Sequence, residues 1–254
     1  MNPKLLRFLI MSKNPIRTKT GQPVVMYQRW RELLFLHWSL DPNKVQASLP
    51  PGLRVDTYSG HAWVGIVPFF MSGVRPRFLP ALPGVSSFQE LNLRTYVVDE
   101  QGRPGVWFYS LDTSHRLPVW IARQFFHLNY LHARMSASRS GGGVQYRSSR
   151  RLDHGWDEEQ TFAWARKGSS RITIKGTLEH FLAERYRLFA YDYKQSKLYT
   201  GCVEHEPYQI QEVALDDYST RLFSMAHFEP PQCAPAQAFG SKGVDVKIYP
   251  LHLA

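Results

Sequence analysis

Alternating hydrophobic and polar residues mark several segments of the chain as half-buried β-strands. Residues 88–98 show the pattern most clearly, because leucine, threonine and valine side chains occupy one face of the expected strand. The opposite face carries Phe88, Glu90, Asn92, Arg94 and Tyr96. A turn at residues 99–105 and a second alternating segment at residues 106–111 predict an antiparallel partner for this strand. The face with Glu90 and Arg94 is unusually polar for a buried one.

Shorter apolar segments bounded by turn-forming residues predict further strands. They are residues 53–56, 62–70, 144–149, 161–165, 172–176, 187–193, 197–205 and 244–249. The first two are expected to form one hairpin, residues 187–205 a second, and the glycines at 141–143 the tip of a third. Residues 27–36 fit either a short helix or an entry strand, and their periodicity does not distinguish the two.

Four segments favour helices. Residues 41–49 begin with Asp41, a capping residue, and Pro42, which suits the first helical position. Residues 117–126 have the apolar spacing of a buried helix, and residues 178–184 and 216–225 predict two short ones. The prolines and glycines of residues 72–87 predict a long, stiff loop of the kind that often covers a binding site. Together these elements predict an α+β fold of mostly antiparallel strands.

The first 23 residues differ in composition from the rest of the chain. They carry five basic residues, three prolines and no acidic residue, which is typical of a flexible extension, and Met11 is an alternative start. Residues 24–254 contain no repeat and are expected to form a single domain of β-barrel type. With two cysteines and no apolar segment of about 20 residues, the chain is expected to be cytoplasmic and without a membrane span.

The formal net charge of +10 raises the question of an anionic partner. Five of the 31 basic residues lie in residues 1–23 and five more in residues 134–151, and the rest of the chain balances its 21 acidic residues. Hydrophobic residues make up 43% of the chain, which excludes a disordered protein. The arginines of residues 134–151, beside Tyr146, leave nucleic-acid binding as an alternative function, although no recognised nucleic-acid motif accompanies them.

Charged residues at positions expected to be buried are the candidate binding groups. Glu90 and Arg94 share a strand face, and Arg123 interrupts the apolar helix predicted at residues 117–126. The alternatives are a solvated Glu90–Arg94 pair and a surface arginine at position 123. His180 and Glu184 have helical spacing, but the chain contains no HExxH motif and no close cluster of histidines and cysteines. We therefore expect no metal and no cofactor.

A series of motifs along the chain is similar to the YqjF-like family of uncharacterised bacterial proteins. The motifs are residues 35–38, 49–53, 55–56, 60–65, 88–97, 105–112, 122–123 and 180–186. The resemblance extends from about Val24 to about Leu251. This family in turn resembles the acetoacetate decarboxylase-like superfamily. The resemblance implies a cone-shaped, mostly antiparallel β-barrel with a ligand pocket inside and a few flanking helices.

The resemblance also implies particular pocket residues. Decarboxylases of that superfamily use a Schiff-base lysine beside a second lysine, and their signature is similar to residues 88–90, 111–112 and 122–124 of this chain. Where the signature continues with proline-lysine-lysine, this chain has Asn129-Tyr130-Leu131. The resemblance therefore implies that Glu90 and Arg123 are pocket residues and that Tyr130 occupies the nucleophile position. It also argues against imine chemistry there.

We expect a pocket that binds a small anionic organic molecule, with a carboxylate as the expected partner. The expected ligand-binding residues are Glu90, Arg94, Arg123 and Tyr130, and Arg75 on the loop could close over an anion. Glu90 and Tyr130 are the candidate catalytic residues if the pocket performs acid–base chemistry of a lyase or hydrolase type. The other alternative is a non-catalytic interaction or nucleic-acid-binding protein that uses residues 134–151. The ligand and the oligomeric state are left open.

Overall fold

The computed structural model describes residues 21–115 and 128–254. The helix predicted over residues 117–126, with Arg123, lies outside these described residues, and so does nearly all of the basic extension at residues 1–23. None of the helices in the described part of the chain has the length and apolar character of a membrane span.

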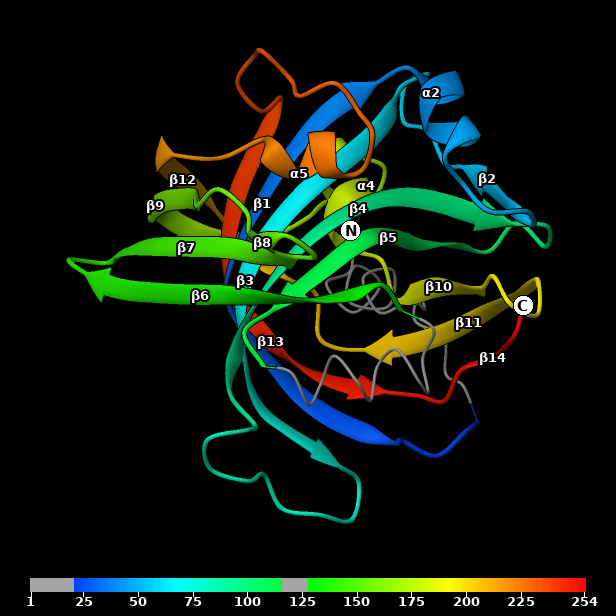
Figure 1. Cartoon of the computed structure of the whole chain (residues 1–254), viewed down its shortest axis with the longest axis horizontal. Coiled ribbons are helices and arrows are strands. Elements are labelled where there is room, and N and C mark those ends of the chain that lie inside the picture. The colour runs from blue at the N-terminus through cyan, green and yellow to red at the C-terminus, as the bar shows by residue number, and fades with distance from the viewer. Residues whose placement is uncertain (1–20, 116–127) are drawn as a thin grey trace, which may run out of the picture.

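The described chain is rich in strands and contains a few short helices, as the sequence predicted (Figure 1). The strands are β1 (Met26–Leu40), β2 (Leu53–Val55), β3 (Ala62–Pro76), β4 (Phe88–Asp99), β5 (Pro104–Thr113), β6 (Tyr130–Ser140), β7 (Gly143–Leu152), β8 (Gly155–Trp156), β9 (Gln160–Ile172), β10 (Arg187–Asp192), β11 (Lys197–Glu204), β12 (Gln209–Asp217), β13 (Gln237–Ile248) and β14 (His252–Leu253). Most neighbouring strands are antiparallel, whereas β5 pairs in parallel with both β10 and β6.

The helices are α2 (Pro42–Ala47), α4 (Leu178–Ala183) and α5 (Arg221–Met225). α2 begins as predicted, because the Asp41 side chain accepts a hydrogen bond from the Asn43 amide at 2.9 Å. α4 also matches its prediction, and the Thr177 hydroxyl oxygen caps it by accepting from the His180 amide at 3.3 Å. α5 occupies only the last part of the predicted segment at residues 216–225, since β12 continues to Asp217.

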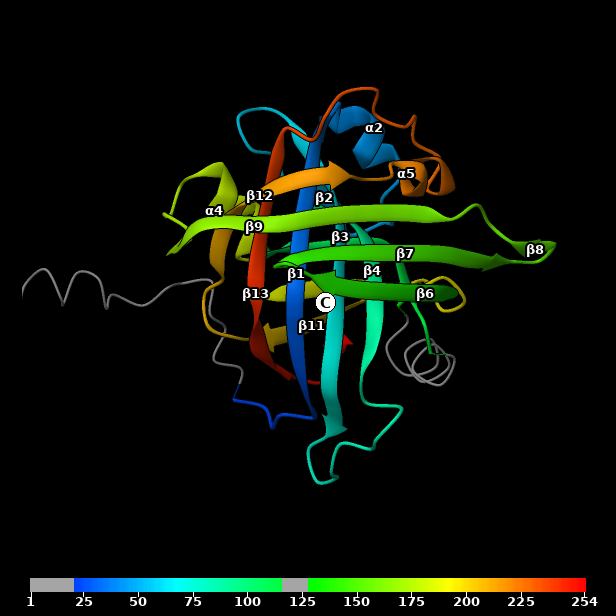
Figure 2. The same ribbon diagram turned by 90° about the vertical axis from the view of Figure 1, so that its left-hand side faces the viewer.

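The strand pairing closes on itself in two circuits that share β13, β1, β3, β4 and β5. β10 and β11 complete the smaller circuit, and β6, β7, β9 and β12 complete the larger one. Figure 2 shows β9, β7 and β6 running across the direction of β13, β1 and β3. Both closures depend on the pairing of β4 with β5, in which Glu90 lies opposite Thr113. The shared strands therefore face one circuit on each side.

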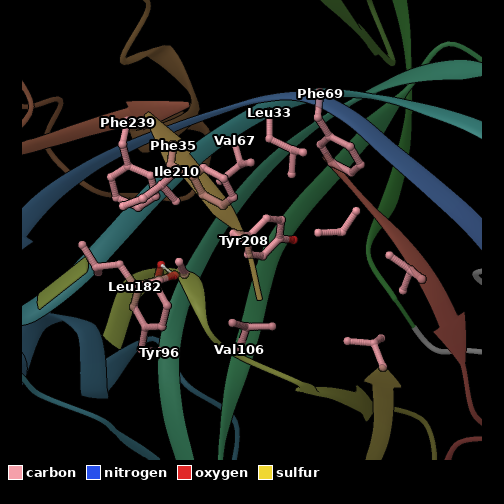
Figure 3. Packing of buried hydrophobic residues seen from close by; sticks show 14 of the residues in the cluster. Leu33, Phe35, Val67, Phe69, Tyr96, Val106, Leu182, Tyr208, Ile210 and Phe239 are labelled. Carbon is pink, nitrogen blue, oxygen red and sulfur yellow. Dashed lines mark hydrogen bonds between the residues drawn. The ribbon is translucent and has the colours of Figure 1, made fainter. Parts of the chain in front are cut away.

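The shared strands bury side chains on both faces, which explains why β4 is buried almost throughout. On β1, Leu33 and Phe35 belong to the hydrophobic core inside the smaller circuit (Figure 3). Their neighbours Leu34 and Leu36 belong to the core inside the larger circuit. Alternation along these strands thus sorts side chains between two interiors rather than between interior and solvent.

Several segments differ from the sequence prediction. β2 and β3 do not form a hairpin, because both pair with β4: Leu53 lies opposite Asp99 and Val64 opposite Thr95. β3 continues to Pro76, so the loop covers only residues 77–87. The prediction of a strand at residues 172–176 is wrong, because β9 ends at Ile172, the first residue of that segment. The sequence also did not predict β12. Local patterns locate extended segments well, but they contain little information about which distant strand becomes the neighbour.

Candidate functional site

A cavity of about 520 Å³ lies inside the smaller circuit. Its wall comes from β1, β3, β4, β5, β6, β10, β11 and β13, and residues of the 77–87 loop line one end. Most lining side chains are apolar, and Glu90 and Arg94 are the charged ones among the described residues. The volume falls within the range of about 300–1,000 Å³ that is usual for small-molecule pockets.

β4 carries Glu90 into this cavity on the face that also bears Asn92 and Arg94. The Tyr130 hydroxyl, at the start of β6, donates a hydrogen bond to Glu90 Oε2 at 3.0 Å. Burial raises the pKa of Glu90 to about 8, and hydrogen bonds from Tyr130 and Asn92 oppose this shift. Glu90 is therefore mostly protonated at neutral pH and titrates close to it.

Arg94 lies at the end of the cavity next to α4 and is 9% exposed. Its hydrogen bonds to described residues come from Nη2, which donates to the Leu182 carbonyl at 3.0 Å and to the Tyr96 hydroxyl at 3.4 Å. The guanidinium carbon also lies 5.4 Å from the centre of the Phe35 ring. Nε is buried and has no hydrogen-bond partner among the described residues. Arg94 thus lines the cavity with a guanidinium whose donors are not all used by the described chain.

Arg94 lacks a carboxylate partner within the described structure. Arg150 pairs with Asp112 at 2.8 Å and Arg185 with Asp56 at 2.7 Å, whereas Arg187, which donates to the Thr200 hydroxyl, does not line the cavity. The residues outside the described ranges contain no aspartate or glutamate that could fill this role. Because a buried charge without a partner is costly, Arg94 is the position in the cavity lining where a bound anion would be stabilised most.

Glu90 and Arg94 line the same cavity without pairing with each other. Four residues of extended strand place their Cα atoms about 13 Å apart. The solvated pair considered as an alternative is not observed, since both side chains are buried. Asn92 lies between them at 5% exposure, and its Oδ1 atom has no hydrogen-bond partner among the described residues. β4 therefore presents a carboxyl, an amide and a guanidinium in succession along one wall.

Tyr208 is a lining residue that sequence analysis missed. Its ring packs against Phe35 at 5.3 Å between centroids, beside the guanidinium of Arg94. Figure 3 shows the Tyr208 hydroxyl pointing away from the hydrogen bond between Tyr96 and Leu182. Burial raises the pKa of this hydroxyl, so it stays protonated and can donate a hydrogen bond. No motif or periodicity marks Tyr208, because it lies in the connection before β12.

The structure places Arg75 outside the cavity lining. Because β3 continues to Pro76, alternation turns Val74 and Pro76 towards the cavity and Arg75 away from it. Arg75 instead stacks on Tyr27, with its guanidinium carbon 4.5 Å from the ring centre. The sequence predicted a loop at Arg75, and a loop has no regular alternation from which the direction of a side chain could be inferred. Arg123 lies outside the described residues, so its place in the pocket stays a prediction.

The arginines of residues 134–151 all contact other side chains. β6 and β7 form the predicted hairpin, with Ser140 opposite Gly143. Arg150 is buried and paired with Asp112, as described above. The exposed members stack or pair as follows: Arg134 and Arg151 on Trp156, Arg139 on Phe70, and Arg147 with Glu159. Their closeness in sequence therefore does not produce a single cluster of unengaged cations on this hairpin.

Across the described ranges, no three His, Cys, Asp or Glu side chains are grouped as metal ligands would be. Glu184, which has helical spacing to His180, accepts hydrogen bonds from the Tyr208 amide at 2.9 Å and from the Tyr186 hydroxyl. Its carboxylate therefore joins the end of α4 to the segment before β12.

The raised pKa of Glu90 predicts that stability falls as the pH rises. This carboxyl titrates near pH 4.5 in the unfolded chain and near pH 8 in the folded protein, so between these values only the folded state holds the proton. The free energy of unfolding then decreases by about 1.4 kcal/mol per pH unit from this group alone. The stability of Glu90→Gln relative to the wild type should therefore increase from about pH 4.5 to about pH 8 and stay constant above that pH. Urea unfolding at several pH values measures it.

Tyr130→Phe is the matched control for that experiment. It removes a hydrogen bond that opposes the rise in the pKa of Glu90, so the decline in stability should persist and extend to higher pH. The same pH dependence in Glu90→Gln as in the wild type would contradict a protonated Glu90 in the cavity.

Comparison with known protein families supports the resemblance noted from the sequence. A family model named DUF2071, described as an uncharacterized conserved protein, matches residues 27–245. The uncharacterized protein YqjF of Bacillus subtilis (strain 168) is 39% identical over 229 residues, which cover 89% of this chain and 91% of that protein. Both matches span nearly all the described strands, and the resemblance to the YqjF-like family is confirmed.

Solved structures with a similar overall fold confirm the predicted fold class. An acetoacetate decarboxylase-like enzyme from Sphingomonas wittichii RW1 is similar with a TM-score of 0.60 at 15% identity, covering 91% of this chain and 94% of that chain. The enduracididine biosynthesis enzyme MppR, complexed with pyruvate, is similar with a TM-score of 0.58 at 13% identity, covering 96% of this chain and 95% of that one. At these identities the likeness concerns the fold alone. The chain therefore belongs to the DUF2071 family and has the acetoacetate decarboxylase-like fold.

Proposed function

We propose that this protein binds a small organic anion, a carboxylate by preference, in the cavity of the smaller circuit, with Arg94 as the anion-binding residue. The observation that carries the proposal is a buried arginine that lines the cavity and has no carboxylate partner in the described chain. A bound carboxylate would supply the missing counter-charge and accept a hydrogen bond from the guanidinium. The pyruvate complex of MppR, a protein of similar fold, supports a small carboxylate as the ligand class.

The proposed binding does not involve a Schiff base. No lysine occurs between Lys44 and Lys167, and the described lining of the cavity contains none. Tyr130, in the position where the resemblance implies the nucleophile, donates a hydrogen bond to Glu90, and burial raises its pKa well above the usual value. A protonated phenol donates hydrogen bonds and cannot form the imine that a neutral amine forms.

Thermal unfolding of the wild-type protein with hexanoate or with hexanamide tests the proposal. The two compounds have the same tail and differ in the charge of the head group. A ligand that binds only the folded state raises the unfolding midpoint with concentration. We expect hexanoate to raise it at concentrations where hexanamide has little effect, with sodium chloride at equal ionic strength as the control. Equal shifts from both compounds, or no shift from hexanoate, would contradict an anion site.

A covalent trap tests the absence of a Schiff base separately. After incubation with pyruvate and borohydride, the mass of the intact protein should be unchanged, because no lysine of the described chain lines the cavity. A mass increase of one reduced pyruvate would show that a lysine does form the imine.

Glu90 favours a second candidate function, acid–base catalysis of a lyase or hydrolase type on the bound anion. A carboxyl whose pKa is raised to about 8 can give and take protons near neutral pH. Tyr130, hydrogen-bonded to the same carboxyl, could donate to the ligand as well. One experiment distinguishes this function from binding alone. Glu90→Gln should still bind the ligand but should no longer convert it, and NMR of the ligand follows the conversion.

A further inference from the structure

The cavity is larger than a small carboxylate requires, and its charged groups project from one strand. A cavity of about 150 Å³ already accommodates benzene, whereas this one measures about 520 Å³. Glu90 and Arg94 both come from β4. The walls contributed by β1, β3 and β11 are mainly apolar and include Trp30, Leu33, Val67, Phe69, Met71 and Val203. Figure 3 shows Leu33, Val67 and Phe69 lying together along this apolar side.

The cavity has a closed end and an open end. Phe88, at the start of β4, and Arg94, six residues later, both line it, which corresponds to a length of about 20 Å along an extended strand. At the Arg94 end, Leu182 of α4 is fully buried. At the other end, Leu79 and Leu82 of the 77–87 loop line the cavity while 58% and 59% exposed. The anion site is thus deep, and the apolar part leads from it to solvent.

We propose that the ligand is an amphipathic carboxylate, whose carboxylate binds Arg94 and whose unbranched hydrocarbon tail extends along the apolar wall towards the 77–87 loop. This inference rests on the proposed function and adds the chemical class and length of the ligand. A tail in this place would cover the apolar loop residues Leu79 and Leu82, which the structure leaves partly exposed.

Polar ligands of similar length fit the same walls poorly. A hydroxyl or amide facing Leu33, Val67 or Phe69 would lose its hydrogen bonds to water without replacement, which is unfavourable. A methylene group in the same place gains from burial, and each buried methylene is worth about a three- to fourfold increase in affinity. Affinity for the cavity should therefore increase with the length of the tail.

A series of straight-chain acids measures this dependence in the full-length protein. We expect the dissociation constants of butanoate, hexanoate and octanoate, determined by calorimetric titration, to decrease by about threefold per methylene. Octanamide is the control for the head group, since it has a tail of the same length without the charge. It should bind much more weakly than octanoate.

Val74→Trp places a bulky side chain in the outer part of the cavity, and Ile174→Trp is its matched control. Val74 lines the cavity near the loop, where its amide donates to the Ser86 carbonyl at 3.1 Å. Ile174 is 70% exposed and does not line the cavity. We expect Val74→Trp to weaken octanoate binding by more than about tenfold and to leave butanoate binding within about twofold. Ile174→Trp should leave both unchanged.

The outcomes separate the inference from the function on which it rests. Equal affinities for butanoate and octanoate, or equal losses for both in Val74→Trp, would overturn the proposed tail and leave the anion site standing. Octanoate binding that depends on length but is matched by octanamide would overturn the proposed function. If Val74→Trp fails to fold, the length series and the octanamide control in the wild-type protein still decide the question.

Discussion

Replacing Arg94 with methionine should weaken hexanoate binding by at least about 30-fold. Removal of one partner from a buried, hydrogen-bonded charge pair costs about 2 kcal/mol or more, and at Arg94 no other described cationic side chain lines the cavity. Methionine keeps much of the side-chain volume, so the apolar surroundings of Phe35 stay filled. Calorimetric titration of the two proteins gives the ratio of their dissociation constants directly.

Arg187→Met is the matched control for that variant. Arg187 is also 9% exposed, but it donates to the Thr200 hydroxyl at 3.1 Å and does not line the cavity. Its variant should bind hexanoate as the wild type does. Because Arg94 also holds the Leu182 carbonyl, Tyr208→Phe provides a second test that removes one donor from the lining and leaves this contact in place. We expect a loss of a few-fold there, and unchanged affinity in Arg94→Met would contradict the anion site.

Arg150→Met should destabilise the fold more than any other single change considered above. The variant leaves Asp112 fully buried without its cation, and breaking a buried ion pair in this way costs about 3–5 kcal/mol. Arg150 also donates to the Ser110 hydroxyl at 2.7 Å, so the same change removes a contact between β7 and β5. Chemical unfolding monitored by circular dichroism measures the loss.

The pH dependence of this loss identifies its cause. Burial raises the pKa of Asp112 to about 6 even though Arg150 opposes the shift. Below that value the carboxyl becomes neutral in the wild type and the variant alike, so the cost of Arg150→Met should be smaller at about pH 5 than at about pH 8. Arg147→Met, on the same strand, removes an exposed pair with Glu159 and should cost no more than about 1 kcal/mol. An equal cost for the two variants at about pH 8 would contradict a buried ion pair at Asp112.

The sequence was most informative where the local pattern and the tertiary structure agree. The alternation of residues 88–98 predicted β4 and put Glu90, Asn92 and Arg94 on one face, and the structure has all three in the cavity lining. The cap at Asp41 and the hairpin at residues 187–205 are confirmed for the same reason, since each depends on neighbours in the chain. The polar face of β4 could be identified from the sequence because burying polar side chains without hydrogen-bond partners or a ligand is energetically unfavourable.

The missing parts of the site depend on contacts between distant segments. Arg75 was assigned to a loop, but pairing with β1 extends β3 as far as Pro76 and turns Arg75 away from the cavity. Tyr208 reaches the cavity only because the chain between β11 and β12 passes beside Phe35. The closure of the two circuits likewise rests on pairings such as β11 with β13 and β5 with β10, which no local pattern specifies.

A crystal structure of the protein with octanoate tests the central claim most directly, because it locates the carboxylate relative to Arg94. We predict that a carboxylate oxygen lies within about 3 Å of a guanidinium nitrogen of Arg94 and that the tail passes along the apolar wall. Octanoate bound outside this cavity, or with its carboxylate at the solvent end and Arg94 engaged by the chain itself, would contradict the account.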